Sequence, residues 1–242
     1  MRFRYHQPIP NFYQIENPHH PKTVISNDFL NEFRDIAIAS RFAGLSYAKL
    51  DDEFKREWDI DWDNIIILKY PMSEDILKME PSKEKCRLMD EEFQEVGAKA
   101  FALADFLREN GFRADLINPL DDRVSLRAIA LQSNDAVITR SNMCLFKEGL
   151  NLGFFMIETS IENLPFKYEN ELEWVWDQCS NCGICIDLCP EKAFDEDGRF
   201  LRRQCTAHRE GCSVCINYCP FYKRGYEKVK QRYWRMKKWM IK

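Results

Sequence analysis

Eight of the ten cysteines in this 242-residue chain lie between positions 179 and 219, and their spacing restricts the fold more than any other feature. The first array, CSNCGICIDLCP, has the spacing C-x2-C-x2-C-x3-C-P and contributes Cys179, Cys182, Cys185 and Cys189. The second array has the spacing C-x6-C-x2-C-x3-C-P and contributes Cys205, Cys212, Cys215 and Cys219. Two arrays with the same ending predict two sets of metal ligands in one small module.

This spacing is typical of ligands to iron–sulfur clusters. Three thiolates two residues apart wrap around one cubane, whereas the fourth, three residues further on, is carried towards a neighbouring cluster. This crossing rule predicts one [4Fe–4S] cluster on Cys179, Cys182, Cys185 and Cys219, and a second on Cys205, Cys212, Cys215 and Cys189. Cys205 departs furthest from the usual spacing, because six residues separate it from Cys212. A protein with such a pair of clusters is expected to transfer electrons at low potential.

Two other uses of clustered cysteines stay open. Structural zinc also binds C-x2-C pairs, although it does not need three cysteines at two-residue steps, twice. Disulfides are disfavoured in a reducing compartment, and we expect a cytoplasmic protein without membrane contact. The amino terminus, MRFRYHQPIPNFYQ, has no apolar signal region, and no window reaches 18 apolar residues. Cys86 and Cys144 lie far from the arrays in sequence and are predicted to be buried thiols.

The residues before the arrays alternate between helical and strand patterns, which predicts a layered α/β domain with a sheet covered by helices. Long helices are expected after Ser26, through residue 46, and after Ser82, where Gly111 provides the stop. A shorter helix is expected over 123–133, and strands over 64–70, 112–117, 135–141, 143–146 and 151–161. P-loop, G-x-G-x-x-G, H-E-x-x-H and G-x-S-x-G motifs are missing, so a nucleotide-dependent or acyl-transfer enzyme is not indicated.

The order of these parts resembles that of epoxyqueuosine reductases and the related reductive dehalogenases. The resemblance is carried by CSNCGICIDLCP and GCSVCINYCP, and by the upstream segments DNIIILKYPM, AKAFALADFLRENGFRADLI and LGFFMIETSIENLPF. It implies an α/β, nitroreductase-like and corrinoid-binding domain in residues 1–172, followed by a two-cluster ferredoxin-like domain in residues 173–222. The chain resembles a shortened form of this family, without the helical-repeat domain that follows the clusters in epoxyqueuosine reductase.

The resemblance also suggests residues for a second cofactor. The family places a glycine-rich turn, A-G-L-G-x-I-G-K-[NS], against a cobalamin, and this chain has QSNDAVITRS at that position. Arg140 and Ser141 match the end of that pattern and become candidates for binding the cofactor's polar edge, although the glycines are missing. The family's proton-donating aspartate has a weak counterpart in Asp115, four residues before Pro119.

Residues 223–242 predict a basic amphipathic helix. The segment 221–242 contains nine Lys or Arg and one Glu, a local charge of +8, so the remainder of the chain carries −12 of the total of −4. An apolar stripe recurs at helical spacing, at Tyr226, Val229, Tyr233, Met236 and Met240. This stripe is expected to pack on the protein itself, and RNA or an acidic electron-donor protein are the alternative partners.

Three functional readings follow. In the first, an oxidoreductase receives electrons through the clusters, passes them to cobalamin or another cofactor in residues 1–172, and uses an acid such as Asp115 to protonate its product. In the second, the chain is an electron carrier or reductive activator that hands electrons to a partner protein. In the third, which depends on the basic tail alone, the clusters are structural and the chain binds RNA, for which the family resemblance suggests tRNA.

Overall fold

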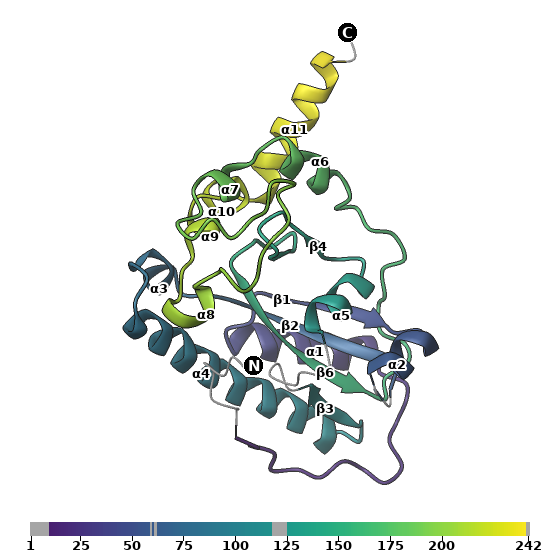
Figure 1. Ribbon diagram of the computed structural model, residues 1–242. Coiled ribbons are helices and arrows are strands. Elements are labelled where there is room, and N and C mark those ends of the chain that lie inside the picture. The colour runs from purple at the N-terminus through teal and green to yellow at the C-terminus, as the bar shows by residue number, and fades with distance from the viewer. Residues whose placement is uncertain (1–9, 59, 61, 118–124, 241–242) are drawn as a thin grey trace.

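The chain forms an antiparallel sheet with helices on both faces, and a cluster of short helices at one end (Figure 1). The computed structural model describes residues 10–58, 60, 62–117 and 125–240. The sheet has the order β1-β2-β6-β3, and every neighbouring pair is antiparallel. Its strands are β1 (Gly44–Lys49), β2 (Asn64–Pro71), β6 (Leu152–Thr159) and β3 (Ala114–Ile117). A separate pair consists of β4 (Val137–Ile138) and β5 (Cys144–Leu145).

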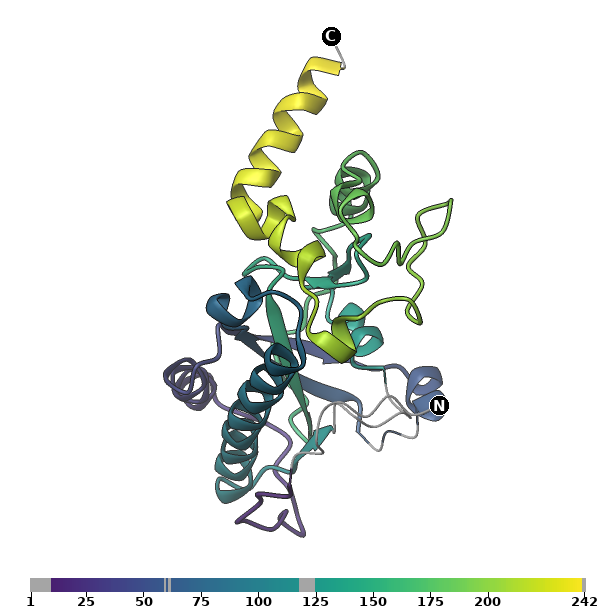
Figure 2. The same ribbon diagram turned by 60° about the vertical axis from the view of Figure 1, so that its left-hand side comes forward.

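The apolar run of β2 explains why both faces of the sheet are covered. Ile66 and Leu68 belong to the core that the sheet shares with α1 (Asn27–Ala39) and α4 (Lys83–Glu109). Ile65 and Ile67 point to the opposite core, which includes α5 (Leu126–Gln132). All four side chains are fully buried, and each such burial contributes on the order of 2 kcal/mol. Figure 2 shows α1 and α4 on one side of the sheet and α5 on the other.

The predicted helix starts are confirmed by their caps. The hydroxyl oxygen of Ser26 accepts a hydrogen bond from the backbone N–H of Phe29, and that of Ser82 accepts one from Lys85. Each bond satisfies one of the free N–H groups in the first turn of its helix. At the other end of α4, Gly111 has a φ of +88°, a left-handed conformation that ends the helix as predicted.

Several predicted boundaries are wrong. The first helix ends at Ala39 and not at residue 46, because Arg41 has a φ of +85° and residues 44–49 instead pair with β2. The strand predicted over 135–141 shrinks to β4, because a tight turn follows in which the Asn142 N–H bonds to the Thr139 carbonyl. Two short helices were not predicted, α2 (Asp52–Trp58) and α3 (Glu74–Lys78).

The cysteine arrays lie in short helices stacked at one end of the sheet (Figures 1 and 2). These helices are α6 (Trp174–Ser180), α7 (Ile184–Asp187), α8 (Ala207–Glu210), α9 (Val214–Asn217) and α10 (Pro220–Arg224). The predicted basic helix is present as α11 (Tyr226–Met240), which projects away from the rest of the molecule. Within the described ranges, no helix has the length and apolar character needed to cross a membrane.

Candidate iron–sulfur centre

Four of the cysteines line one cavity, and we call them the first thiol group: Cys179, Cys182, Cys185 and Cys219. The first three come from α6, the following turn and α7, and the fourth caps the start of α10. Gly183 has a φ of +67°, which glycine adopts without strain, and this conformation turns the chain between Cys182 and Cys185. The fourth member comes from the second array, as the crossing rule predicts for one cluster.

The remaining four array cysteines are called the second thiol group: Cys189, Cys205, Cys212 and Cys215. Burial raises the pKa of Cys215 to about 12, with smaller contributions from the other three members. Cys185 of the first group also raises the pKa of Cys215. The two groups therefore adjoin each other between α7 and α9, which are themselves in contact.

The thiols have the chemistry of cluster ligands held in a shielded site. Burial raises the pKa of Cys185 to about 11 and that of Cys219 to about 12, so both thiols are protonated at neutral pH until metal displaces the proton. Among the described residues, no three or more His, Cys, Asp or Glu side chains are gathered closely enough to hold a metal ion. The ligands of a cubane surround a body of several atoms and are spread more widely, and the four thiols around the first cavity have the chemistry of such ligands.

Arg140 and Ser141 lie in the wall of the cavity of the first thiol group. The Arg140 guanidinium donates hydrogen bonds to the backbone carbonyls of Ser180 (3.4 Å) and Asp197 (3.2 Å). Burial raises the pKa of Cys179, and the neighbouring Arg140 partly offsets this effect. The Ser141 hydroxyl is buried and lies 2.9 Å from that of Thr139. Both side chains therefore lie at the first thiol group.

A buried lysine in α4 lies against the second array, and sequence reasoning missed it. Lys85 is 1% exposed, and its ammonium donates hydrogen bonds to the Leu77 carbonyl (2.9 Å), the Met79 carbonyl (2.7 Å) and the Ser213 hydroxyl (2.6 Å). Three acceptors match the three N–H groups of an ammonium. Burial lowers the pKa of Lys85, and the nearby Cys212 partly offsets this shift. No local pattern could reveal this contact, because 128 residues separate Lys85 from Ser213.

The two remaining cysteines differ from each other. Cys144 is 4% exposed, as predicted, and burial raises its pKa to about 12. Cys86 is only half-buried, so the prediction of a buried thiol is wrong for this residue. Its sulfur lies 3.9 Å from the His208 carbonyl oxygen in α8, because α4 runs alongside the second array.

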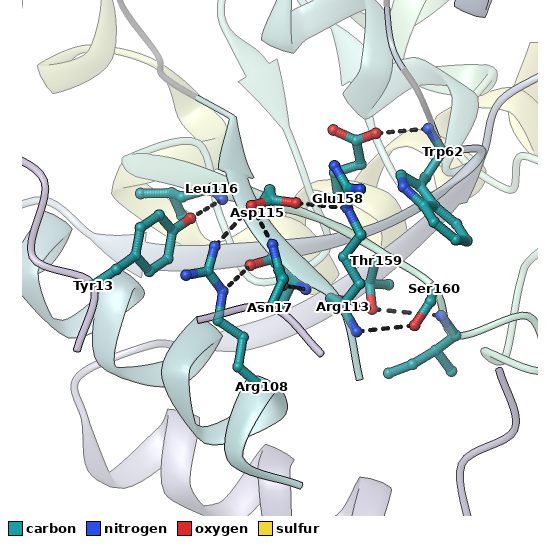
Figure 3. A network of polar contacts seen from close by, with 12 residues as sticks. Tyr13, Asn17, Trp62, Arg108, Arg113, Asp115, Leu116, Glu158, Thr159 and Ser160 are labelled. Atoms are coloured by element: carbon teal, nitrogen blue, oxygen red, sulfur yellow. Dashed lines mark hydrogen bonds and ion pairs between the residues drawn. The ribbon is translucent and has the colours of Figure 1, made fainter. Parts of the chain in front are cut away.

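Asp115 lies in β3 at an edge of the sheet, away from α6 and α7 (Figures 1 and 2). One carboxylate oxygen accepts hydrogen bonds from Asn17 (2.8 Å) and Arg108 (2.7 Å), and the other accepts one from Arg113 (2.8 Å). Figure 3 shows these side chains converging on it. The network ties the amino-terminal segment and α4 to the edge strand. Pro119, which defined the match to the family's aspartate, lies outside the described residues.

The predicted stripe of the basic tail packs on the protein itself over its first half. Tyr226, Val229 and Tyr233 are buried in a core that also contains Trp174 of α6. The Trp174 ring lies 5.0 Å from that of Tyr233, centroid to centroid. Met236 breaks the pattern, with 46% of its surface exposed. The side chain of Met240 lies outside the described residues.

Comparison with protein families identifies the first array. Residues 172–195 match the 4Fe-4S binding domain family, and this segment contains all four cysteines of that array. An epoxyqueuosine reductase of Bacillus anthracis is 30% identical over 79 residues, which cover 25% of this chain and 20% of that protein. The sequence similarity thus spans a small part of the curated relative.

Two solved structures have a similar fold. A catabolic reductive dehalogenase has a TM-score of 0.70 at 12% identity, and the match covers 93% of this chain and 37% of the dehalogenase. An epoxyqueuosine reductase solved with a tRNA-Tyr stem loop has a TM-score of 0.55 at 14% identity, over 82% of this chain and 66% of the reductase. The resemblance to both families is thereby confirmed at the level of the fold. Together with the 4Fe-4S domain, it supports an iron–sulfur redox function.

Proposed function

We propose that this protein passes low-potential electrons through two [4Fe–4S] clusters to a substrate or cofactor in the domain formed by residues 1–172. One observation carries the proposal: the cavity of the first thiol group gathers three thiols from one array and one from the other, which leaves four array cysteines for a second cluster. A structural metal site does not need this exchange. Two adjacent redox centres do, because shared loops hold them close enough for electron transfer.

In this proposal the first cluster is bound by Cys179, Cys182, Cys185 and Cys219, and the second by Cys189, Cys205, Cys212 and Cys215. Bound clusters would supply one-electron chemistry at potentials that, for this class, range from about −700 to +450 mV. Residues 173–222 act as the two-cluster ferredoxin-like domain, and residues 223–242 as a basic helix packed on it. All eight array thiols are half-buried, so the short helices cover the proposed sites only in part.

The nitroreductase-like domain of residues 1–172 touches both thiol groups, which supports a path for electrons into it. Arg140 lines the cavity of the first group, and Lys85 lies beside the second. An electron carrier would need contact between this domain and only one of the two thiol groups. The substrate is most simply placed on this domain, and a solved relative in complex with a tRNA-Tyr stem loop makes tRNA a candidate.

Cobalamin is the cofactor that the family resemblance implies, and the residues expected to hold it do not fit that role. The Arg140 guanidinium is bonded to the backbone of the cluster domain, and the Ser141 hydroxyl to Thr139. Asp115 is held by two arginines at the far edge of the sheet. No step of the proposed function is therefore assigned to cobalamin, nor to Asp115 as a proton donor.

The alternative is an electron carrier or reductive activator for a partner protein, with no substrate of its own. One observation favours it: a cavity beside the first thiol group is lined by basic side chains of α10 and α11, which suits a charged protein partner. In this reading, the amino-terminal domain serves as a platform.

Anaerobic reconstitution of the full chain tests the proposal. We expect about eight irons and eight sulfides per chain and, after reduction by dithionite, the electron paramagnetic resonance of two interacting [4Fe–4S] centres. A content of about four irons, or zinc in place of iron, would overturn the two-cluster proposal.

The same sample separates the enzyme from the carrier. The protein is mixed with cobalamin, desalted, and its visible spectrum recorded, and tRNA binding is measured by gel shift. Retained cobalamin or bound tRNA would favour an enzyme with a substrate of its own. A spectrum of clusters alone, with electron transfer to an acceptor protein, would favour the carrier.

A further inference from the structure

A cavity of about 410 Å³ lies between the first cysteine array and the carboxyl-terminal helices. Cys182 and Ile184 form one wall, and side chains of α10 and α11 form the other. Because Cys182 also belongs to the first thiol group, a molecule seated in this cavity would touch the loop that holds that group. Because the rate of electron transfer falls steeply with distance, this position suits a redox partner better than any other kind of ligand.

The cavity is basic. Its charged lining consists of one acidic residue, Asp177, and of Arg224, Lys228, Arg232 and Lys237. The Asp177 carboxylate is already occupied, by the Tyr233 hydroxyl at 2.6 Å and the Lys237 ammonium at 2.9 Å. Over the part of the chain that the structure describes, Arg224, Lys228 and Arg232 are exposed and have no acidic partner. Three uncompensated cations beside a cysteine loop predict an anionic partner.

The helix that carries these charges packs on α6 along its first half, and the Lys237–Asp177 ion pair adds one contact further out. Trp174 packs against Tyr226 and Tyr233, which fixes the start of α11 on α6. Beyond Tyr233 the helix projects from the molecule (Figure 2), with Trp234 and Trp239 48% and 77% exposed. Exposed tryptophan beside arginine is typical of the residues that dominate the free energy of protein interfaces.

One face of the helix combines both features. Lys228, Arg232 and Met236 follow one another at four-residue steps, and Trp239 follows three residues later, so all four lie on one side of α11. The first three also line the cavity. Cationic and apolar groups therefore form one continuous surface that runs from the cysteine loop outwards along the helix.

The charge of the whole chain orients a partner towards this surface. The segment 221–242 carries +8, and the remainder carries −12. An acidic protein is therefore attracted to α10 and α11 and repelled by the rest of the molecule, which both speeds its approach and sets its orientation.

From these observations we infer that the surface formed by the α6–α7 loop, α10 and α11 docks an acidic electron-transfer protein, of the small iron–sulfur or flavin class. The inference rests on the proposed function and adds the partner's charge and the point of electron delivery. One electron would leave the partner's reduced cofactor and reduce the cluster held by the first thiol group, with no bond made or broken. The cluster held by the second thiol group, beside α4, would be the next acceptor.

The test uses the reconstituted full chain and two acidic probes, a plant-type [2Fe–2S] ferredoxin and a flavodoxin, each reduced beforehand. Stopped-flow absorbance gives the rate at which each probe is reoxidised, as a function of salt. We expect the K228E/R232E variant to lose at least about tenfold in rate at low ionic strength, with the difference vanishing at high salt. The matched control K49E/R56E reverses two exposed cations on β1 and α2, away from α11, and should keep the wild-type rate.

Direct reduction by dithionite distinguishes failure of the proposed function from failure of the docking surface. If the wild type shows no reducible cluster, the proposed function is wrong. If dithionite reduces the wild type and all variants, the proposed function stands. The docking surface alone is then overturned if K228E/R232E and the wild type react with the probes at equal rates. It is also overturned if neither probe reduces the wild type. Should K228E/R232E not fold, K228Q/R232Q replaces it, with a smaller expected loss.

Two other occupants are also outcomes of this test. A gel shift with tRNA that K228E/R232E abolishes, while its rates with both probes stay unchanged, would overturn the inference in favour of RNA. Sedimentation that shows a dimer in the wild type and a monomer in K228E/R232E, again with unchanged rates, would overturn it in favour of a second copy of this chain.

Discussion

The two thiol groups come from nearly the same cysteine pattern, yet the chain surrounds them differently. The first borders a basic cavity and is approached by Arg140, a partly exposed side chain bonded to two backbone carbonyls. The second is approached by Lys85, an ammonium 1% exposed and fully hydrogen-bonded. A charge acts more strongly where water is excluded, so the buried lysine should influence its cluster more than the arginine does. A repeated cysteine motif thus supplies the same kind of ligand twice, whereas the side chains packed around each thiol group determine its electrostatic environment.

The largest expected effect comes from the exchanged ligands. Cys219→Ser should remove the first cluster and Cys189→Ser the second, although each cysteine lies in the other array, because the two thiol groups exchange these members. We expect iron to fall from about eight to about four per chain in each variant.

Electron paramagnetic resonance should then show that Cys189→Ser keeps the same centre as Cys205→Ser. The control Cys86→Ser changes a half-buried thiol beside the second array and should keep all the iron. A Cys189→Ser protein that instead matched Cys179→Ser would mean that the arrays do not exchange ligands.

A smaller effect is expected from Lys85→Met. The substitution leaves the Met79 carbonyl without the ammonium, whereas the Leu77 carbonyl keeps its hydrogen bonds from Ser213 and Asn217, so the free energy of unfolding should fall by about 1–3 kcal/mol. It should also lower the reduction potential of the second cluster, since a nearby cation favours the reduced, more negative form. Urea unfolding and a potentiometric titration followed by electron paramagnetic resonance measure the two effects.

Lys83→Met, at an exposed position two residues earlier in α4, is the matched control and should change neither quantity. If Lys85→Met shifted the potential of the first cluster and not the second, the placement of this lysine would be contradicted.

Arg140→Gln should shift the potential of the first cluster in the same direction but by less. The guanidinium lies partly in water, where solvent and salt screen its charge. The shift should therefore shrink as ionic strength rises, whereas that of Lys85→Met should not. Titrations in low and high salt check this difference, and equal shifts for the two variants would remove the contrast between the groups.

The smallest effect on either cluster is expected from Asp115→Asn. The variant loses ion pairs with Arg108 and Arg113 at the edge of the sheet, so stability should fall by about 1–2 kcal/mol while both potentials stay unchanged. Thermal unfolding and the same titration test this, with Asp28→Asn on the exposed start of α1 as the control. If Asp115→Asn kept its stability but lost substrate turnover, Asp115 would again be a candidate for the catalytic acid.

The sequence predicted the elements with strong local signals. The serine caps of α1 and α4 and the continuous apolar run of β2 depend on near neighbours, and both are found in the structure. The strand β1 was missed because its residues continue the preceding helical pattern and become a strand only by pairing with β2. The short helix α3 could have been found from Ser73, whose hydroxyl caps it.

The surroundings of the candidate site could not be predicted in the same way. The contact between Lys85 and Ser213, and the position of Arg140 beside Cys179, depend on how two distant parts of the chain pack. A lysine in a polar helix start gives no sign of burial. A family pattern pointed to Arg140, but for a cofactor edge and not for the cysteine cavity that it lines.

The position of Lys85 has a consequence for how the protein is made. All four strands of the main sheet precede Cys179, so the sheet can form on the ribosome before any array cysteine has emerged. The Lys85 ammonium lacks one of its acceptors until Ser213, which lies 128 residues later and directly follows Cys212, has been made. The Ser213 hydroxyl can reach the ammonium only when the second array folds against α4. The burial of this lysine should therefore be one of the last steps in the folding of the newly made chain.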